Sequence, residues 1–465
     1  MVFQNNVLSG AAGSGTTVYA IDQSIRFNDD DSAYMYRTPS SASDRDKWTW
    51  SAWIKKGNSG QNGMLFSAPL GSSGGYLAIQ YGSLDQFMLY QWTGSGYDFD
   101  VRTTQKFRDP SAWYHYVVVY DSGNAVSTER VKLYVNGQRI TDLTGASSSP
   151  AYPSQNTDSY INNTVQHSIG YYIRPPGSDG LYFDGHMAEI HFLDGYAYDP
   201  SYFGEFNNSG IWIPKEYTGS YGTNGFKIDG RDSSDLGDDE SGNGNDYTTS
   251  GLASNDQVSD SPTTNWCVMN PLLNNGCTYT NGNLEVAPPN NQSTHRLILG
   301  TQGILPSDTN KYYWEITYLN PDNPSSSVNM LGIGELDTGV NPASNALNQS
   351  GGYALGYNAT TSNLYSSSVW TANGSPTWSG GFTAGAVYGV AYDGSTKRLY
   401  FYENNTALNS GNHFATYTGS APLGPGASLY YSPSSSKLIF NMGNNGFTYT
   451  PPTGYVAVNT TNLGS

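Results

Sequence analysis

Short apolar and aromatic runs alternate with stretches rich in Gly, Ser and Asn along most of the chain. The clearest run covers 114–120, and it is followed by a second run at 131–135 and then by Asn136 and Gly137. An Asn-Gly pair adopts the positive φ angles of a tight turn between antiparallel strands. The same design returns at 387–405, where a strand, a Gly-containing turn and a second strand follow one another. The pattern therefore predicts two antiparallel hairpins far apart in the chain, and with them two β-sandwich domains.

Alternation within the runs predicts which side chains face a core. In the strand expected at 48–56, Trp48 and Trp50 lie on one face and Trp53 on the other. We assign Trp48, Trp50 and Trp314 to the core. No stretch has a convincing helical period, although 199–206 is consistent with a helical turn or two. The fold class is therefore predicted to be all-β, with two jelly-roll sandwiches in tandem.

Composition shifts divide the chain into four segments. Residues 1–20 are small, polar and Gly-rich, which predicts either a disordered tail or an arm that docks on a partner. The first sandwich is expected at 21–228 and the second at 263–465. Between them, 229–262 is rich in acids, Ser, Gly and Asn, which predicts an acidic linker or a long loop.

The balance of charge excludes some partners. The chain has 465 residues and a formal net charge of −17, which opposes binding to nucleic acid and to anionic membrane surfaces. No run is long and apolar enough for membrane insertion, and the N-terminus does not look like a secretory signal. The two cysteines, Cys267 and Cys277, allow one disulfide or two thiols kept reduced in a cytosol.

Motifs in order along the chain carry two family resemblances. The first set is RFNDDDSAYMYRTPS, WTWSAWIKK, WYHYVVVYDSG, VKLYVNG and FDGHMAEIHFLDGYAYDP. It resembles laminin-G-like or pentraxin-like modules, which have the concanavalin A-like jelly roll, over about 21–200. The second set begins with KYYWEITY and continues through MLGIGELD, AVYGVAYD and RLYFYENN to FTYTPP. It resembles an SPRY domain over about 263–463.

The combination of both sandwiches, with the opening VFQNNVLSG and YAIDQSIRFNDDDSAYMYRTPSS, resembles fibre-like structural proteins of tailed phages that infect marine bacteria. This resemblance implies a virion protein, made in the host cytoplasm, that is a fibre, a spike or a head decoration. Its partners would be other virion proteins, further copies of itself and a host cell-surface glycan or protein. A cement protein without host recognition is an alternative, and a surface-polysaccharide depolymerase is a third.

Calcium is the one cofactor that the sequence suggests, because laminin-G-like modules often hold Ca²⁺ on the sandwich rim. Asp239, Ser241, Asn243 and Asn245 match the start of a calcium loop, with a Gly at the sharp turn. Ser250 stands where the last ligand of such a loop is a bidentate Glu. A solvated acidic turn therefore remains the alternative to a metal site.

Concanavalin A-like folds include β-glucanases, which need two carboxylates beside the scissile bond. Those enzymes carry the acids on one strand as Glu-x-Asp-x-x-Glu. The nearest match here is Glu189, His191 and Asp194, where the middle acid is replaced by His. We expect Glu189 to make a structural hydrogen bond, and we expect no catalytic residues.

Glycan binding is the chemistry that the sequence favours. Sugar sites stack aromatic faces on pyranose rings and surround the hydroxyls with a few polar groups. Aromatic residues in loop-like stretches are the candidates, namely Trp92, Tyr97, Trp370 and Trp378. We expect Trp370 and Trp378 to be exposed, because their neighbours are nearly all turn-forming residues.

Overall fold

The structure is a computed structural model that describes residues 19–70, 74–172, 181–273, 275–290, 293–319, 328–337, 339–357, 362–430 and 435–463. These residues form two compact units, of which the first ends at Thr264 and the second begins at Asn265. The predicted arm, 1–20, lies outside the described residues except for Tyr19 and Ala20. No helix within the described ranges is long and apolar enough to span a bilayer.

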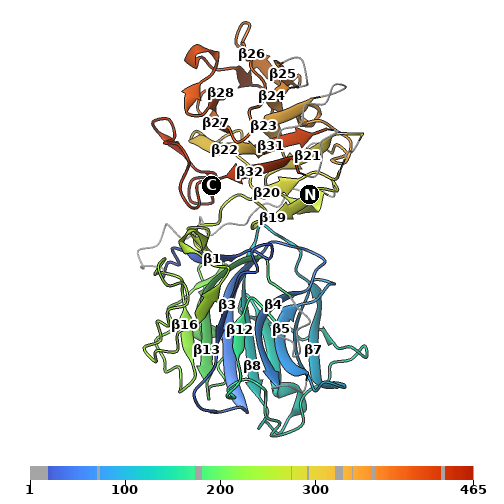
Figure 1. Cartoon of the computed structure of the whole chain (residues 1–465), viewed down its shortest axis with the longest axis vertical. Helices are drawn as coiled ribbons and strands as arrows, with labels where there is room; N and C mark the ends of the chain where they lie inside the picture. Colours follow the sequence, from blue (N-terminus) through green and yellow to red (C-terminus); the bar gives the residue numbers. More distant parts are fainter. Residues whose placement is uncertain are drawn as a thin grey trace. The chain divides into compact units, whose positions relative to one another are not determined.

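The first unit, drawn from blue to yellow-green in Figure 1, is a sandwich of two eight-stranded antiparallel sheets. The strands of the sheet that we call the β3 sheet are, in spatial order, β10 (Gln138–Arg139), β9 (Val131–Val135), β8 (Trp113–Asp121), β3 (Lys47–Lys56), β13 (Gly185–Asp194), β1 (Ser24–Phe27) and β18 (Gln257–Val258), with β16 (Phe226–Ile228) paired to β13. The strands of the facing β6 sheet are β11 (Leu143–Thr144), β7 (Tyr97–Lys106), β6 (Gln86–Trp92), β5 (Gly75–Tyr81), β4 (Gly63–Leu70), β12 (His167–Ile169), β2 (Tyr34–Arg37) and β17 (Thr248–Ser250).

The second unit, drawn from yellow to red, is also built from two sheets. The ten-stranded β22 sheet follows the order β19 (Thr278–Thr280), β20 (Glu285–Ala287), β32 (Lys437–Asn441), β22 (Lys311–Leu319), β27 (Val387–Asp393), β28 (Arg398–Glu403), β30 (Ala415–Tyr417) and β26 (Trp370–Ala372), with β29 (Thr406–Ala407) paired to β28 and β33 (Tyr455–Val456) to β22. The five-stranded β23 sheet has the order β21 (Arg296–Leu299), β31 (Leu423–Leu429), β23 (Asn329–Glu335), β24 (Tyr353–Tyr357) and β25 (Ser362–Ser366).

Helical structure in the described ranges consists of 3₁₀ turns, namely η3 (Ser127–Glu129), η4 (Pro200–Tyr202), η5 (Ser254–Asp256), η6 (Pro271–Leu273), η7 (Leu347–Ser350) and η8 (Asn409–Gly411). The helical turn expected at 199–206 is therefore η4, and a short strand, β14 (Gly204–Phe206), follows it. The all-β fold class is confirmed, because strands supply both layers of each sandwich.

Both predicted hairpins are present. β8 pairs with β9, and Asn136 and Gly137 then form the turn into β10 with φ angles of 47° and 76°. In the second unit β27 pairs with β28 from Tyr388 to Asp393. The local turn chemistry thus determines where these strands reverse, as the Asn-Gly signal predicts.

The three tryptophans assigned to cores are fully buried. Trp48 and Trp50 lie in the core of the first unit and Trp314 in that of the second, each with 0% of its surface exposed. The ring of Trp48 stacks on Tyr120 with centroids 5.2 Å apart. Trp53 packs on the opposite side of β3, as alternation requires. No disulfide joins Cys267 to Cys277.

The acidic segment 229–262 belongs to the first sandwich and is not a linker between domains. Its strands β17 and β18 pair with β2 and β1. Its acids are used as ion partners, because Asp256 lies 3.0 Å from Arg26 and Asp260 lies 2.7 Å from Lys55. Composition favoured the linker alternative here, but a stretch rich in acids can also belong to a sandwich when some of its carboxylates, such as Asp229, Asp256 and Asp260, pair with cations.

One outer face of the first sandwich is buried under other parts of the chain. The segment 196–221, with β14 paired to β15 (Trp212–Pro214), packs over the outer side of the β3 sheet. The segment 256–260 meets the same side through Asp256 and Asp260. We call this surface the covered face, and its polar residues include Arg26, Lys55, His115, His186, Glu189 and His191.

Candidate functional site

The outer side of the β6 sheet carries a cluster of aromatic rings, which we call the Trp92 face. Its inward-pointing neighbours, such as Leu77, Leu89 and Val101, are fully buried in the core. The outward-pointing residues of β5, β6 and β7 are aligned by the strand register into the rows Tyr76–Trp92–Tyr97, Ala78–Tyr90–Asp100 and Gln80–Met88–Arg102. Period-two alternation therefore places aromatic, amide, carboxylate and guanidinium groups on one surface.

Trp92 and Tyr97, both predicted as ligand-binding residues, lie side by side. They are paired across the turn that joins β6 to β7, where the Thr93 amide donates to the Gly96 carbonyl. Their ring centroids are 5.0 Å apart and the ring planes cross at 75°. Tyr97 is 43% exposed and Trp92 is half-buried. The two rings thus form a corner with one wall open to solvent.

Arg102 is held beside this corner in a fixed orientation. Its Nε and Nη2 atoms donate to the two carboxylate oxygens of Asp100 at 2.7 and 2.9 Å. Its guanidinium also lies 5.6 Å from the Tyr97 ring centroid and donates to the Tyr97 hydroxyl at 3.2 Å. Burial disfavours the charge of Arg102, but Asp100 outweighs that effect and keeps the Arg102 pKa above its ordinary value. A cation is therefore fixed at the edge of the aromatic corner.

Deeper in the same face, the tyrosine hydroxyls bond to one another. The Tyr90 hydroxyl lies 3.1 Å from that of Tyr76 and 3.2 Å from Oε1 of Gln80. Burial, followed by the neighbouring Tyr76, raises the pKa of Tyr90 far above its ordinary value. Tyr90 is thus a neutral, fixed support for the exposed rings. Sequence reasoning missed Tyr76, Tyr90 and Arg102, although the period-two alternation of 76–80 and 88–92 contained the signal.

Trp370 and Trp378 are buried, so the prediction that they are exposed is wrong. Trp370 is 6% exposed, and its ring nitrogen donates to the Gly351 carbonyl at 2.8 Å. Trp378 is 7% exposed and packs 5.2 Å from the ring of Phe382. Turn-forming neighbours determine the backbone path, but they do not decide whether a large ring turns inward to fill the sandwich.

The four residues of the predicted calcium loop form a closed hydrogen-bond network. Oδ1 of Asp239 accepts from the Lys227 amide at 2.8 Å and from the Ser241 amide at 2.9 Å. Oδ2 accepts from the Ser241 hydroxyl and from the Asn245 amide, each at 2.8 Å. The side-chain oxygen of Asn245 accepts from Arg37, and Asn243 donates to backbone carbonyls. Across the described residues, no three His, Cys, Asp or Glu side chains gather as metal ligands. The Asp239 carboxylate is therefore bonded by protein donors on both oxygens, and Asp239 and Asn245 are buried in this turn.

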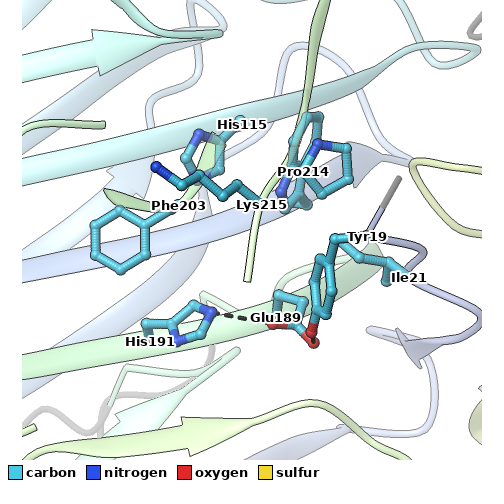
Figure 2. Close-up of a pocket in the computed structure, with 9 residues that line it drawn as sticks. Tyr19, Ile21, His115, Glu189, His191, Phe203, Pro214 and Lys215 are labelled. Carbon is cyan, nitrogen blue, oxygen red and sulfur yellow. Dashed lines mark hydrogen bonds and ion pairs between the residues drawn. The ribbon is translucent and has the colours of Figure 1, made fainter. Parts of the chain in front are cut away.

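Glu189 lies at a strained position on the covered face (Figure 2). A β-bulge interrupts the pairing of β13 with β3 between Ala188 and His191, and Glu189 there has a φ of 47°. Such a left-handed conformation costs a non-glycine residue on the order of 1 kcal/mol. The bulge turns the carboxylate toward the segment that carries Tyr19.

The Glu189 carboxylate is buried and ionised. Its oxygens lie 2.9 Å from the Tyr19 hydroxyl, 3.1 Å from Nε2 of His191 and 3.3 Å from Nζ of Lys227. Burial opposes the charge, but His191 and Lys227 outweigh it and lower the Glu189 pKa to about 2. The narrow hollow beside it, lined also by His115, is too small to hold a water molecule. A carboxylate held ionised by two basic groups is suited to anchoring Tyr19 and not to donating a proton.

Glu189 and Asp194 do not converge on a common substrate position. Asp194 pairs in register with Trp48, so its side chain points to the opposite side of β13 from His191. There it accepts from the Asn162 side chain and the Asn224 amide, each at 2.8 Å. The carboxylate pair that a glycosidase of the expected pattern requires is therefore not assembled by these two residues.

Comparison with known families identifies both sandwiches. Residues 29–197 match the family model described as the concanavalin A-like lectin/glucanases superfamily, and residues 311–445 match that of the SPRY domain. The chain therefore carries a concanavalin A-like domain and an SPRY domain in tandem, as the motif order predicts. The Trp92 face lies in the first of these domains.

Solved structures resemble the chain, or one part of it, at low identity. A putative carbohydrate binding protein from Bacteroides ovatus shares 16% identity, with 50% of this chain and 58% of that chain covered and a TM-score of 0.33. The SPRY domain of human HERC1 shares 17% identity, covering 37% of this chain and 96% of that chain with a TM-score of 0.27. Domains LG4-5 of the mouse laminin alpha1 chain share 9% identity over 94% of each chain with a TM-score of 0.28. A comparison with curated proteins gave no match.

Proposed function

We propose that this tandem of a concanavalin A-like domain and an SPRY domain is a glycan-binding protein, and that the Trp92 face is its binding surface. The observation that carries the proposal is the corner formed by Trp92 and Tyr97, with Arg102 fixed at its edge. A sugar ring has an apolar C–H face and a rim of hydroxyls, so it needs an aromatic wall and a few oriented polar groups. The corner and Arg102 supply both.

The geometry suggests how a saccharide would bind. One pyranose ring would stack on the open side of Tyr97 or against Trp92, where exposed aromatic surface is available. The Arg102 guanidinium is anchored by two bonds to Asp100, so it would donate to a sugar oxygen without first losing side-chain entropy. Tyr90 and Tyr76 support the rings from beneath and are not expected to touch the ligand.

In its biological setting, we propose that the protein is a non-enzymatic structural component of a tailed-phage particle that presents this face to a host-surface glycan or protein. The resemblance of the opening sequence to phage fibre-like proteins supports this part of the proposal. A binding role without hydrolysis is supported by the positions of Glu189 and Asp194, which point to opposite sides of β13. Several copies on one particle would raise a weak single-site affinity by avidity.

The binding proposal can be tested on a glycan array with the purified full chain. Trp92→Ala and Tyr97→Ala should each weaken binding to the best glycan by about tenfold or more, which corresponds to about 1.4 kcal/mol. Tyr202→Ala is the matched control, because Tyr202 is 42% exposed but stacks on Tyr198 on another side of the same unit. Unchanged binding by both Trp92 and Tyr97 variants would contradict the proposal.

The proposal that the protein does not hydrolyse polysaccharide has a separate test. Incubation of the protein with polysaccharide from the host surface should release no reducing ends. Release that disappears in Glu189→Gln would contradict this expectation and favour a depolymerase. Release that persists in Glu189→Gln would also contradict it, and would place the chemistry elsewhere in the chain.

A further inference from the structure

A second aromatic surface lies on the outer side of the β22 sheet, in the SPRY domain. Three central strands of that sheet, β22, β27 and β28, are paired over most of their lengths. Their register aligns the outward-pointing residues into the rows Lys311–Asp393–Arg398, Tyr313–Ala391–Tyr400 and Glu315–Gly389–Tyr402. Tyr449 and Tyr455 come to the same surface from the C-terminal segment, because β33 pairs with β22 at Lys311 and the Tyr449 amide donates to Glu315. We call this surface the tyrosine face.

The floor of the tyrosine face is a buried ring. A Cβ atom at Gly389 would lie 2.6 Å from the Tyr313 hydroxyl, so the absence of a side chain on β27 lets Tyr313 lie across the strand. Tyr313 is 2% exposed, and the rings of Phe447 and Tyr402 are centred 5.0 and 6.5 Å from its own. Burial, followed by Glu315, Tyr402 and Tyr449, raises the Tyr313 pKa far above its ordinary value.

Four tyrosines around this floor are half-buried, namely Tyr400, Tyr402, Tyr449 and Tyr455. None of their hydroxyls has a hydrogen-bond partner in the part of the chain that the structure describes. By contrast, Tyr388 and Tyr417 of the same sheet bond to Glu403 and Glu335. A single unbonded surface tyrosine is ordinary, but four neighbouring ones leave a set of hydroxyls available to an external partner.

One end of the tyrosine face is positively charged although the chain as a whole carries −17. Lys311 lies 5.7 Å from the Tyr455 ring centroid and pairs with Asp393 at 3.3 Å. Arg398 is exposed, Lys397 is half-buried, and neither forms an ion pair within the described residues. At the other end, the Glu315 carboxylate is fully buried and accepts from the Thr448 and Tyr449 amides, so it is not presented to a ligand.

We infer that the tyrosine face is a second binding site, and that its ligand is an acidic polysaccharide whose sugar rings stack on Tyr400 and Tyr402 while a carboxylate or sulfate pairs with Arg398. Stacking uses the ring faces, and the free hydroxyls donate to ring or hydroxyl oxygens of the sugar. A neutral glycan would leave the Arg398 guanidinium without a counter-charge. A nucleic acid would meet the same cations, so binding to single-stranded DNA is one outcome of the test below.

This inference goes beyond the function proposed for the Trp92 face, and the two can fail separately. The experiment is affinity electrophoresis of the full chain in gels that contain polygalacturonate, dextran sulfate or neutral dextran. The first two polymers separate carboxylate from sulfate recognition. Retardation is expected in at least one acidic gel and not in neutral dextran, and it should weaken between about 50 and about 300 mM NaCl because salt screens surface charge.

Variants locate the site. Tyr400→Ala combined with Tyr402→Ala should raise the dissociation constant about tenfold or more. Tyr400→Phe with Tyr402→Phe keeps the packing, and it should weaken binding by a smaller factor through the loss of two hydroxyls. Arg398→Ala should reduce binding and flatten its dependence on salt. Tyr365→Ala is the control within the same unit, because Tyr365 is half-buried on the other sheet.

Several results would overturn the inference. They are equal retardation in neutral dextran, no retardation in either acidic gel, and full binding by the variant that combines Tyr400→Ala with Tyr402→Ala. Binding that is lost in Trp92→Ala but kept in the double variants would assign the acidic ligand to the Trp92 face instead. Tighter binding to single-stranded DNA than to either polymer would also reject the proposed ligand.

Discussion

The two sheets of the first sandwich carry the same kinds of residue on their outer sides but use them differently. On the covered face, Trp113, His186 and Glu189 lie under the chain and are almost completely buried. On the Trp92 face, Tyr97 is 43% exposed and Arg102 is half-buried. Aromatic and ionisable residues on a strand therefore do not identify a binding surface by themselves. What decides is whether another segment of the chain supplies their partners.

Buried and exposed ion pairs differ most clearly in how they are surrounded. On the covered face, Asp260 has a side chain that is 0% exposed and lies 2.7 Å from Nζ of Lys55, and it accepts from the Trp113 ring nitrogen at 2.9 Å. On the surface, Asp158 is 57% exposed and lies 2.8 Å from Arg45. Low dielectric makes the loss of a buried partner costly, whereas solvent and salt screen an exposed pair.

The largest effect is therefore expected for Asp260→Ala. This substitution should lower the free energy of unfolding of the first unit by about 3–5 kcal/mol, because the Lys55 ammonium loses its buried counter-charge. Asp158→Ala should cost at most about 1 kcal/mol. Urea unfolding followed by tryptophan fluorescence measures both. Equal losses in the two variants would mean that the segment 256–260 does not hold the covered face closed.

The next effect depends on pH and concerns His186. This side chain is 1% exposed, and neither ring nitrogen has a hydrogen-bond partner in the described structure. Burial lowers its pKa from 6.5 to about 3, although nearby Asp260 opposes the shift. As pH falls below 6.5 the unfolded chain binds a proton that the folded chain does not, so stability is lost between pH 6.5 and about 3.

His186→Leu removes this titration. The free energy of unfolding of the variant at pH 7 should be close to that of the wild type, because an unbonded imidazole is replaced by an apolar side chain. At about pH 4 the variant should exceed the wild type by about 3 kcal/mol. Urea unfolding at the two pH values measures the difference. A constant difference between variant and wild type would show that His186 is protonated in the folded protein or accessible to water.

Sequence reasoning succeeded where a signal was local. Alternation placed Trp48 and Trp50 in the core, and the Asn-Gly turn located the β9–β10 hairpin. Trp92 and Tyr97 were found as separate candidates, and only the register of β6 with β7 shows that they form one corner. Short-range patterns thus determined the strands and selected two residues of the proposed site.

The signals that failed depended on distant segments. Glu189 receives its hydrogen bond from Tyr19, 170 residues away, and its ion partner from β16. Trp370 is buried because Gly351 and Tyr417 lie beside it, although its own neighbours form turns. The 229–262 segment looked like a linker because its cationic partners are on β1 and β3. The composition of a short stretch carries no information about contacts with residues far away in the sequence.

A smaller pH-dependent effect is expected at Glu189. Its pKa in the folded protein is about 2, against 4.5 ordinarily, so its stabilising contribution is complete above pH 4.5 and is lost as pH falls toward 2. Glu189→Gln should therefore lower stability by about 2 kcal/mol at pH 7, since the amide keeps part of the hydrogen bonding. The difference from the wild type should shrink toward zero near pH 2. A difference that stays constant with pH would contradict an ionised, buried Glu189.

The smallest effect on stability is expected for substitutions on the Trp92 face, in contrast to those on the covered face. Tyr97 contributes an edge contact to Trp92 and a cation–π contact to Arg102, so Tyr97→Ala should cost about 1 kcal/mol or less. Tyr202→Ala, which removes an equally exposed ring stacked on Tyr198, should cost a similar amount. Thermal unfolding measures both losses, and only Tyr97→Ala should reduce glycan binding. If Tyr97→Ala instead destabilises the domain as strongly as Asp260→Ala, the ring is a structural support, and the distinction between a covered and a ligand-binding face fails.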